Sequence, residues 1–486
     1  MEDLKLEEGT EVPSIPDPPY SIFTTWQKVL IVTLVSLAAT FSSFSANIYY
    51  PAIPSISLDL NVSPELVTLT VTSYMLFQGL SPTIWGAIAD VHGRRIIYIV
   101  TFVIFFGACI GLALTKNFAQ LIILRCLQST GSASTIAIGA GVIGDITRRE
   151  ERGGFMGIFQ AGLLIPNAAG PILGGVFTAT LGWRAIFWFL AIYSGVFLLS
   201  LILLLPETLR SLVGNGSVPA KGLATNPISY CQRLRKKRDD TGPDAVALST
   251  VREPKEMDFL GPLRLLFGVE VSCAIIFLAA YYTGWQMTIS AMSTLFKQAY
   301  GLSDLNIGFT FIGNGAGCIV GTLTTGKLLD FQYRGLRKQY TGDSANFPLE
   351  KARFRTVWLW SGLQISSILV FGWTLEKRVH ISVPIICTFI LGWSTSSIQS
   401  IVTTFMVDVF PDRSASAVAS LNLARCLMGA GGTAAVLPLV NAIGIGWTFT
   451  FMTGMLCLAG GLIFVQIRYG ARRRRQRERK ALDNST

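Results

Sequence analysis

Charged residues are scarce in this chain of 486 residues. Asp, Glu, Lys and Arg make up 14% of it, whereas soluble domains carry about 25%. Only two histidines are present, His92 and His380, and both fall beside expected turns, so no buried histidine relay is expected. Hydrophobic residues, by contrast, make up 51% of the chain. This balance indicates a protein embedded in a lipid bilayer.

Residue patterns that support covalent or metal chemistry are also missing. Of the eight cysteines, seven fall within apolar segments and only Cys231 falls in a polar one, so no disulfide framework is expected. No spacing is typical of a zinc or iron–sulfur site, and no nucleophile with a base stands near an expected membrane interface. The sequence therefore predicts no enzyme, no metal site and no cofactor.

What the chain does contain is a series of apolar segments. A helix that crosses the hydrocarbon core needs about 20 residues, and twelve segments qualify, beginning near residues 28, 66, 96, 119, 153, 184, 268, 304, 355, 381, 414 and 446. Asn, Ser and Gly dilute those near 304 and 414, but small residues let membrane helices approach closely. The predicted fold is an all-α membrane protein whose twelve transmembrane helices form two pseudo-symmetric six-helix halves.

Lys and Arg are concentrated in alternate connections between these segments. The segment 51–65 has no basic residue, whereas the turn at 90–95 and the tail after residue 468 have many. By the positive-inside rule the basic connections and both termini face the cytoplasm. The net charge of +11 therefore reflects orientation in a membrane, and no nucleic-acid partner is expected.

The same distribution predicts the organisation of the chain. We expect a cytoplasmic tail (1–25), an N-terminal six-helix bundle (26–206), a cytoplasmic linker (207–265), a C-terminal six-helix bundle (266–468) and a basic cytoplasmic tail (469–486).

A charged turn stands between the second and third apolar segments. It contains Gly86, Asp90, Gly93, Arg94 and Arg95, and Gly326, Asp330 and Arg334 repeat part of it, each displaced by 240 positions. An acid and two arginines at a tight turn can bridge neighbouring helix ends, which predicts a gating latch in each half. The alternative is that these charges only cap helices and fix topology.

Two arginines fall inside apolar segments. Arg125 lies in the fourth, and Arg425 lies about twelve residues into the eleventh, near the middle of the bilayer. An ionised side chain at such depth faces a cavity or a partner, and no Asp or Glu falls deep in any segment. We therefore expect an electropositive substrate site that suits an organic anion, lined by Arg125, Arg425, Gln128, Asn47, Gln286 and Asn422. The alternative is that the arginines bond to backbone carbonyls and amides and serve structure or proton coupling.

These features together resemble a known family. The turn at Gly86 to Arg95, the set Arg125, Gln128 and Gly131, and the helix 5 set Gly157, Gly170, Pro171, Gly174 and Gly175 match motifs of the major facilitator superfamily, in its twelve-helix branch of fungal drug:proton antiporters. Pro166 stands where that family usually has Gly. Stretches such as Asn47–Ala52, Gly139–Ile146, Leu205–Arg210 and Leu423–Gly432 are closer still to fungal citrate exporters and the quinidine-resistance branch.

The resemblance implies a plasma-membrane exporter of a small organic compound that works by alternating access, with protons as a possible second partner. An organic anion such as citrate is the favoured substrate, and multidrug or secondary-metabolite efflux with proton antiport is the alternative. Helix 5 is the antiporter-motif helix, whose glycines either seal a leak path or provide ordinary close packing. An importer, a membrane sensor and an intramembrane enzyme are less consistent with these motifs. We further expect a monomer with a glycan at Asn61, the one Asn-x-Ser/Thr site of three on the outer face.

Overall fold

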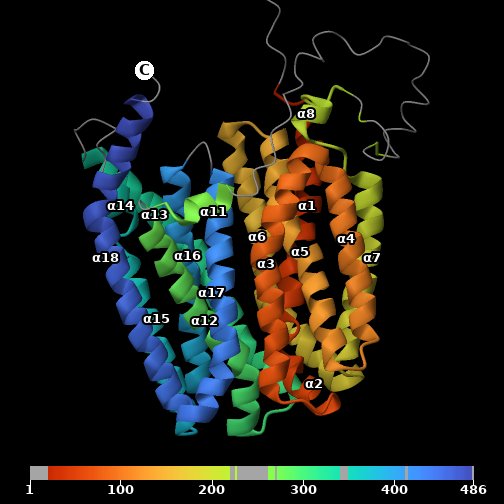
Figure 1. Cartoon of the computed structure of the whole chain (residues 1–486), viewed down its shortest axis with the longest axis vertical. Coiled ribbons are helices and arrows are strands. Elements are labelled where there is room, and N and C mark those ends of the chain that lie inside the picture. The colour runs from red at the N-terminus through yellow and green to blue at the C-terminus, as the bar shows by residue number, and fades with distance from the viewer. Residues whose placement is uncertain are drawn as a thin grey trace, which may run out of the picture.

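A computed structural model describes residues 20–218, 220, 225–226, 261–268, 271–339, 349–410 and 414–483. Twelve long helices account for most of these residues. They are α1 (Thr25–Asn47), α3 (Pro64–His92), α4 (Arg94–Ala113), α5 (Phe118–Ile146), α6 (Arg149–Leu181) and α7 (Arg184–Leu204) in the N-terminal half, and α12 (Ser272–Tyr300), α13 (Asp304–Gln339), α15 (Val357–Glu376), α16 (Ser382–Val409), α17 (Ser414–Ile443) and α18 (Ile445–Asp483) in the C-terminal half. Figure 1 shows the two halves side by side. The predicted fold is confirmed.

Short helices join or flank the long ones. They are η1 (Tyr50–Ala52), α2 (Ile53–Asp59), α8 (Arg210–Val213), α11 (Gly261–Leu266) and α14 (Leu349–Arg353). Two of them, α8 and α11, fall at the ends of the predicted linker 207–265, most of which lies outside the described residues. The predicted boundary at residue 468 falls inside α18, which continues as a helix into the basic tail.

Hydropathy alone identifies nine spans among the described residues, with α1 counted together with its extension through α2. The three long helices outside that set are α3, α12 and α15, whose sequences mix Ser, Thr, Gly and Trp with aliphatic residues. They pack against the other long helices of the two halves, so their polar and small residues serve contacts within the bundle.

Local sequence signals set several helix ends. Thr24 caps α1 and accepts from the Gln27 backbone N–H, while the Gln27 side chain accepts from the Thr24 N–H. Asn117 caps α5 in a similar way. Such side chains satisfy backbone N–H groups that have no partner inside the helix.

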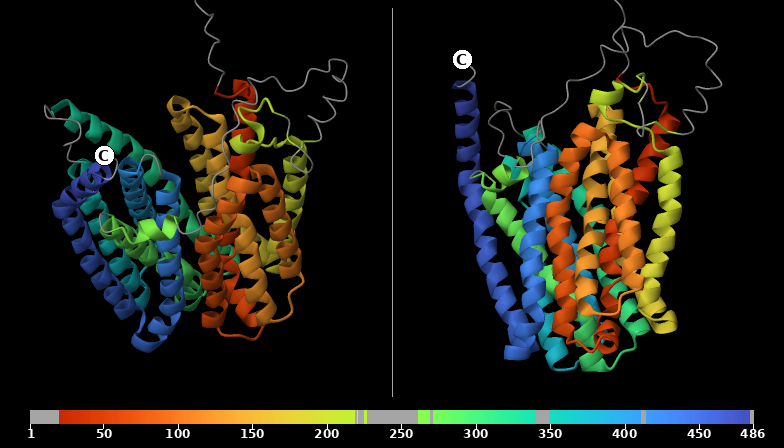
Figure 2. Two further views of the ribbon diagram at one scale, coloured as in Figure 1. Left: turned by 45° about the horizontal axis from the view of Figure 1, so that its top comes forward. Right: turned by 45° about the vertical axis from the view of Figure 1, so that its right-hand side comes forward.

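We call the end of the bundle where α1 begins and α18 ends the terminal end, and the other the distal end. The halves meet mainly through α3 against α17 and α6 against α13. Hydrogen bonds between them lie from the middle of the bundle to the distal end, and join Ser55 to Asp304, Tyr50 to Gln286, Glu65 to Asn441 and Gln78 to Asn422. Toward the terminal end the halves diverge (Figure 2).

Candidate transport site and gating network

Arg125 is fully buried inside the N-terminal half. Its Nη1 donates to the Ser45 carbonyl at 3.1 Å and to Gln128 Oε1 at 2.6 Å. The guanidinium carbon lies 4.3 Å from the ring centroids of both Tyr49 and Tyr74. The side chain is therefore held in place by two aromatic rings, a carbonyl and an amide, all of its own half.

The charge of Arg125 has no carboxylate beside it among the described residues. Two of its groups, Nε–H and Nη2–H, have no hydrogen-bond partner in the described part of the chain. The electron-rich faces of the two tyrosine rings attract the cation instead, and such an interaction strengthens away from water. Arg125 therefore makes the bonds to a backbone carbonyl and to Gln128 that were given as the alternative to substrate contact. Contact of Arg125 with a substrate stays a prediction.

Arg425 is only partly buried and lies on α17. Its Nε and Nη2 both donate to Asn422 Oδ1, at 3.1 and 2.8 Å, and its Nη1 lies 3.4 Å from Gln399 Oε1. The guanidinium carbon is 4.8 Å from the ring centroid of Tyr282. Every partner that the described residues give Arg425 is neutral, so a partly exposed positive charge stands in the middle of the bundle.

The other predicted site residues fall into separate groups. Asn47 donates to Asn167 Oδ1 at 3.0 Å and to the Ser43 carbonyl. Gln286 donates to the Tyr50 hydroxyl of the opposite half at 2.5 Å. The structure thus pairs Arg125 with Gln128 and Arg425 with Asn422, but no described contact joins the two pairs.

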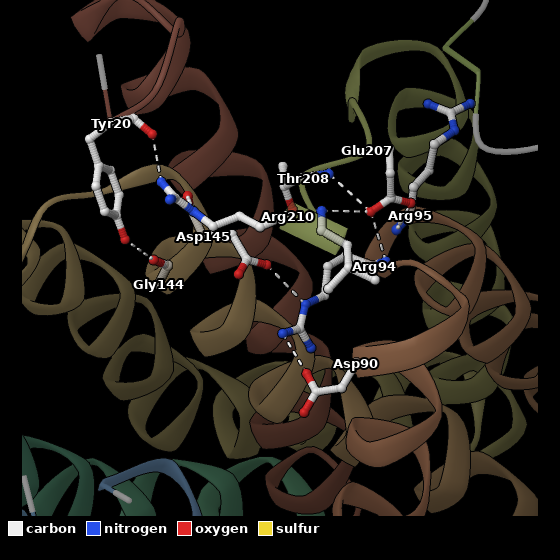
Figure 3. A network of polar contacts seen from close by, with 10 residues as sticks. Tyr20, Asp90, Arg94, Arg95, Gly144, Asp145, Glu207, Thr208 and Arg210 are labelled. Atoms are coloured by element: carbon white, nitrogen blue, oxygen red, sulfur yellow. Dashed lines mark hydrogen bonds and ion pairs between the residues drawn. The ribbon is translucent and has the colours of Figure 1, made fainter. Parts of the chain in front are cut away.

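The charged turn of the N-terminal half forms a three-residue ion network (Figure 3). Arg94 Nη2 lies 2.5 Å from Asp90 Oδ1, and Arg94 Nε lies 3.1 Å from Asp145 Oδ2 near the end of α5. Asp145 was absent from the predicted latch, since its contribution depends on the packing of α5 against α4. The sequence signals for Asp145 are its place before the end of an apolar segment and its membership of the stretch Gly139–Ile146, which carries the family resemblance.

Arg95 and Glu207 bind the end of α7 to the start of α4. Arg95 Nη1 donates to the Leu205 carbonyl and Nη2 donates to the Ile202 carbonyl at 2.6 Å. Glu207 is buried, and its carboxylate accepts from the backbone N–H groups of Arg94 and Arg95 at 2.9 and 3.2 Å. A carboxylate at a helix N-terminus also stabilises the helix dipole.

Glu207 was not among the predicted latch residues, although it belongs to the stretch Leu205–Arg210 that carries the family resemblance. Its carboxylate also accepts from the N–H groups of Thr208 and Leu209, so this one side chain organises both the start of α4 and the chain that leaves α7.

Gly93 makes the α3–α4 turn possible. Its φ is +110° with ψ 141°, and a Cβ there would lie 2.6 Å from Glu207 Oε2. This backbone conformation is essentially restricted to glycine. The residue therefore both reverses the chain and leaves room for the carboxylate. At Gly86, a Cβ would make only an ordinary contact with Ala137.

The second copy of the motif lies in a helix and not in a turn, and its role as a latch stays a prediction. Asp330 and Arg334 lie within the continuous helix α13, and their side chains are outside the described residues. The residue at the position of Gly93, displaced by the same 240 positions, is Tyr333. Tyrosine resists a positive φ, so the helix continues instead of turning.

The segment before α1 and the start of the linker cover the terminal end of α5. Arg210 Nε donates to the Asp145 carbonyl at 2.9 Å and Nη2 donates to the Tyr20 carbonyl at 2.6 Å. At the same end, Lys28 Nζ lies 2.7 Å from Glu151 Oε1 and lowers the pKa of that carboxyl. These contacts fix the terminal ends of the N-terminal helices around the ion network.

The glycines of α6 face two different neighbours. A Cβ at Gly170 would lie 3.0 Å from Asn47 Cβ, and one at Gly174 would lie 2.1 Å from the Ile48 carbonyl oxygen, at the end of α1. A Cβ at Gly175 would lie 3.0 Å from Gly308 Cα on α13, in the other half. Gly157 has no such neighbour. Pro166 and Pro171 both lie within the continuous helix.

Two six-helix halves that touch at one end, with a partly exposed cation between them, define a membrane transporter whose halves enclose the substrate. The chain belongs to the Major Facilitator Superfamily, whose family model matches residues 35–433. The predicted membership is therefore confirmed.

Named relatives cover nearly the whole chain. This chain is 41% identical to citrate exporter 1 of Aspergillus niger over an alignment of 496 residues, and the alignment covers 98% of this chain and 93% of that protein. It is 32% identical over 481 residues to quinidine resistance protein 1 of Saccharomyces cerevisiae, covering 93% and 85%. These relatives confirm the resemblance to the fungal drug-antiporter branch.

Solved structures support the fold alone. A bacterial homolog of the human lysosomal transporter Spinster, crystallised in an inward-facing and unoccupied conformation, superposes with a TM-score of 0.63 at 13% identity, over 93% of this chain and 99% of that one.

Proposed function

We propose that this protein exports a small organic anion across the plasma membrane by alternating access. The observation that carries the proposal is Arg425, a partly exposed cation whose described partners are all neutral. An arginine binds a carboxylate through two parallel N–H groups. The 41% identity to citrate exporter 1 favours a carboxylic acid of the citrate class.

The conformation can be placed in the transport cycle from an assigned orientation. We assign the terminal end to the cytoplasm, on the basis of the basic residues gathered there. The halves touch at the distal end, so this conformation receives substrate from the cytoplasm. With the inside of the cell negative, the membrane potential contributes about 2.3 kcal/mol per exported charge per 100 mV, and export of an anion therefore needs little or no coupling to protons.

The test is efflux of radiolabelled citrate from preloaded vesicles, with Arg425→Gln and Arg425→Lys compared at matched surface expression. We expect efflux from the wild type and nearly none from Arg425→Gln. In Arg425→Lys most of the efflux should be lost, because an ammonium group lacks the two parallel N–H groups of a guanidinium. Efflux that survives in Arg425→Gln would contradict the proposal. Arg125→Gln serves as a comparison, since a buried guanidinium is expected to affect protein yield first.

The second candidate is multidrug efflux with proton antiport, favoured by the 32% identity to quinidine resistance protein 1. Quinidine efflux that depends on an imposed pH gradient, together with no citrate efflux from a protein confirmed at the surface, would support it.

The orientation has its own test in N-glycosylation. We expect a mobility shift on glycosidase treatment that is lost in Asn61→Gln, because Asn61 is exposed at the distal end. A shift lost in Asn484→Gln instead would reverse the assigned orientation.

A further inference from the structure

This inference rests on the proposed function and concerns a residue that competes with the substrate for two N–H groups of Arg425, which we call its fork. Both Nε and Nη2 of Arg425 donate to one atom, Asn422 Oδ1, at 3.1 and 2.8 Å. These two N–H groups form one edge of the guanidinium, and an arginine uses such an edge to bind a carboxylate. The amide oxygen of Asn422 therefore stands where a substrate carboxylate is expected.

Asn422 also reaches the other half of the protein. Its Nδ2 donates to the Gln78 carbonyl on α3 at 3.2 Å. Because the carboxamide is planar, its oxygen and nitrogen move together when the side chain rotates. Displacement of Oδ1 from Arg425 would therefore also remove the hydrogen bond to Gln78, at the contact between α3 and α17.

The exchange favours a charged ligand. A carboxylate bound to a guanidinium makes shorter and stronger hydrogen bonds than a neutral amide does. Two contacts of Arg425 do not depend on Asn422, namely Gln399 Oε1 at 3.4 Å and the ring of Tyr282. These hold the guanidinium in position while Asn422 leaves.

We propose that Asn422 is a displaceable internal ligand that links substrate binding to separation of the halves. A substrate carboxylate takes the Nε and Nη2 groups of Arg425, Asn422 rotates away, and its bond to Gln78 is lost. Asn422 thereby opposes substrate binding and holds α17 to α3 in the conformation described. A direct substrate contact by Asn422 would have the opposite effect on affinity.

The first experiment measures citrate binding to the purified full-length protein in lipid nanodiscs by calorimetry. In Asn422→Ala the fork is free, and we expect the citrate Kd to fall about threefold to tenfold. In Asn422→Asp a fixed carboxylate occupies the fork, and we expect the Kd to rise by about a hundredfold or more. Asn441→Ala is the matched comparison, since Asn441 also lies on α17 and bonds across the halves, to Glu65 at 2.6 Å, without contacting Arg425. It removes a bond between the halves but leaves the N–H groups of Arg425 occupied, so its citrate Kd should fall less than that of Asn422→Ala.

The second experiment measures the coupling. Spin labels carried by unnatural amino acids replace Leu58 and Ile443, exposed side chains on the distal ends of the two halves. Citrate should widen the distance between the labels in the otherwise wild-type protein, and Asn422→Ala should show part of that widening without citrate.

The outcomes separate this inference from the proposed function. A citrate Kd that rises in Asn422→Ala, or a label distance that citrate leaves unchanged, would overturn the role of Asn422 and leave organic-anion export standing. A wild type that binds neither citrate nor related di- and tricarboxylates overturns the proposed function, and the inference with it. Should Asn422→Ala fold poorly, Asn422→Ser keeps a polar side chain too short for the fork and gives the same test.

Discussion

Arg353 Nε lies 2.8 Å from Asp408 Oδ2, and this ion pair takes the place in the C-terminal half that Arg94 and Asp145 take in the N-terminal half. Asp145 and Asp408 each precede the last residue of the fourth long helix of their half, α5 and α16. Each arginine stands at or just before the third long helix and is mostly buried. The described part of the second half therefore contains an ion pair in the corresponding place, whereas the side chains of the predicted Asp330 and Arg334 lie outside that part.

Removal of Asp408 should weaken the second half. Asp408→Asn removes the negative charge that lies 2.8 Å from the mostly buried Arg353, and we expect the free energy of unfolding to fall by roughly 1–3 kcal/mol. Thermal unfolding of the purified protein in detergent measures the change. Arg353→Gln should cost a similar amount, and the double variant should cost less than the sum of the two. Additive losses would mean that the two side chains do not stabilise each other.

Gly93 and Gly182 separate backbone strain from a steric clash. Both have positive φ, +110° and +83°, but a Cβ at Gly182 meets nothing within 4 Å, whereas one at Gly93 meets Glu207. Gly182→Ala should cost about 1–3 kcal/mol from strain alone, and Gly93→Ala should cost clearly more and slow transport. Melting temperatures and efflux rates measure both. Equal losses at the two sites would argue against close packing of Glu207 at Gly93.

Glu207 should contribute more to stability than a partly exposed carboxylate does. Glu207→Gln removes the negative charge from four backbone N–H groups, and hydrogen bonds to charged groups contribute about 1.5–3 kcal/mol each. We expect a lower melting temperature and slower efflux. The control is Glu151→Gln, whose partly exposed carboxylate pairs with Lys28 and should contribute less than about 1 kcal/mol. If the control lost as much stability as Glu207→Gln, the proposed importance of the buried site would be wrong.

Gly308 tests the contact between α6 and α13. A Cβ there would lie 2.6 Å from the Pro171 carbonyl oxygen, so Gly308→Ala should hold the distal ends of the halves apart and lower turnover severalfold. Gly454→Ala adds the same methyl group to α18 at a position with no neighbour within 4 Å and should leave turnover unchanged. Efflux and the distance between labels at Leu58 and Ile443 measure the effect. A Gly308→Ala protein with wild-type turnover would show that this contact is not needed for transport.

The fold was predictable because its dominant signal is local. Apolar length fixes where a helix crosses the membrane, and this signal survives even in α13 and α17, where small polar residues dilute it. Helix ends were less predictable, as α18 shows, because a basic segment can continue a helix beyond the bilayer.

The site was predictable only in part. The sequence singled out Arg125 and Arg425, but burial of Arg125 between Tyr49 and Tyr74 depends on how α1, α3 and α5 pack. Glu207 and Asp145 meet Arg94 from more than fifty positions away in the chain. Such partners are set by tertiary packing, which spacing along one segment does not reveal. In the second half the repeated Gly, Asp and Arg do not mark a turn, because Tyr333 stands at the position of the glycine that makes the turn and α13 continues as a helix.

The contact of Gly175 with Gly308 has a consequence for the energetics of the cycle. Backbone meets backbone there, so neither residue brings side-chain rotamers that must be ordered when the halves approach. Closing the distal end at this point costs no side-chain conformational entropy, and opening it regains none. The balance between the two conformations is therefore left to the polar contacts around it, such as Ser55 with Asp304, and to whatever occupies the fork of Arg425.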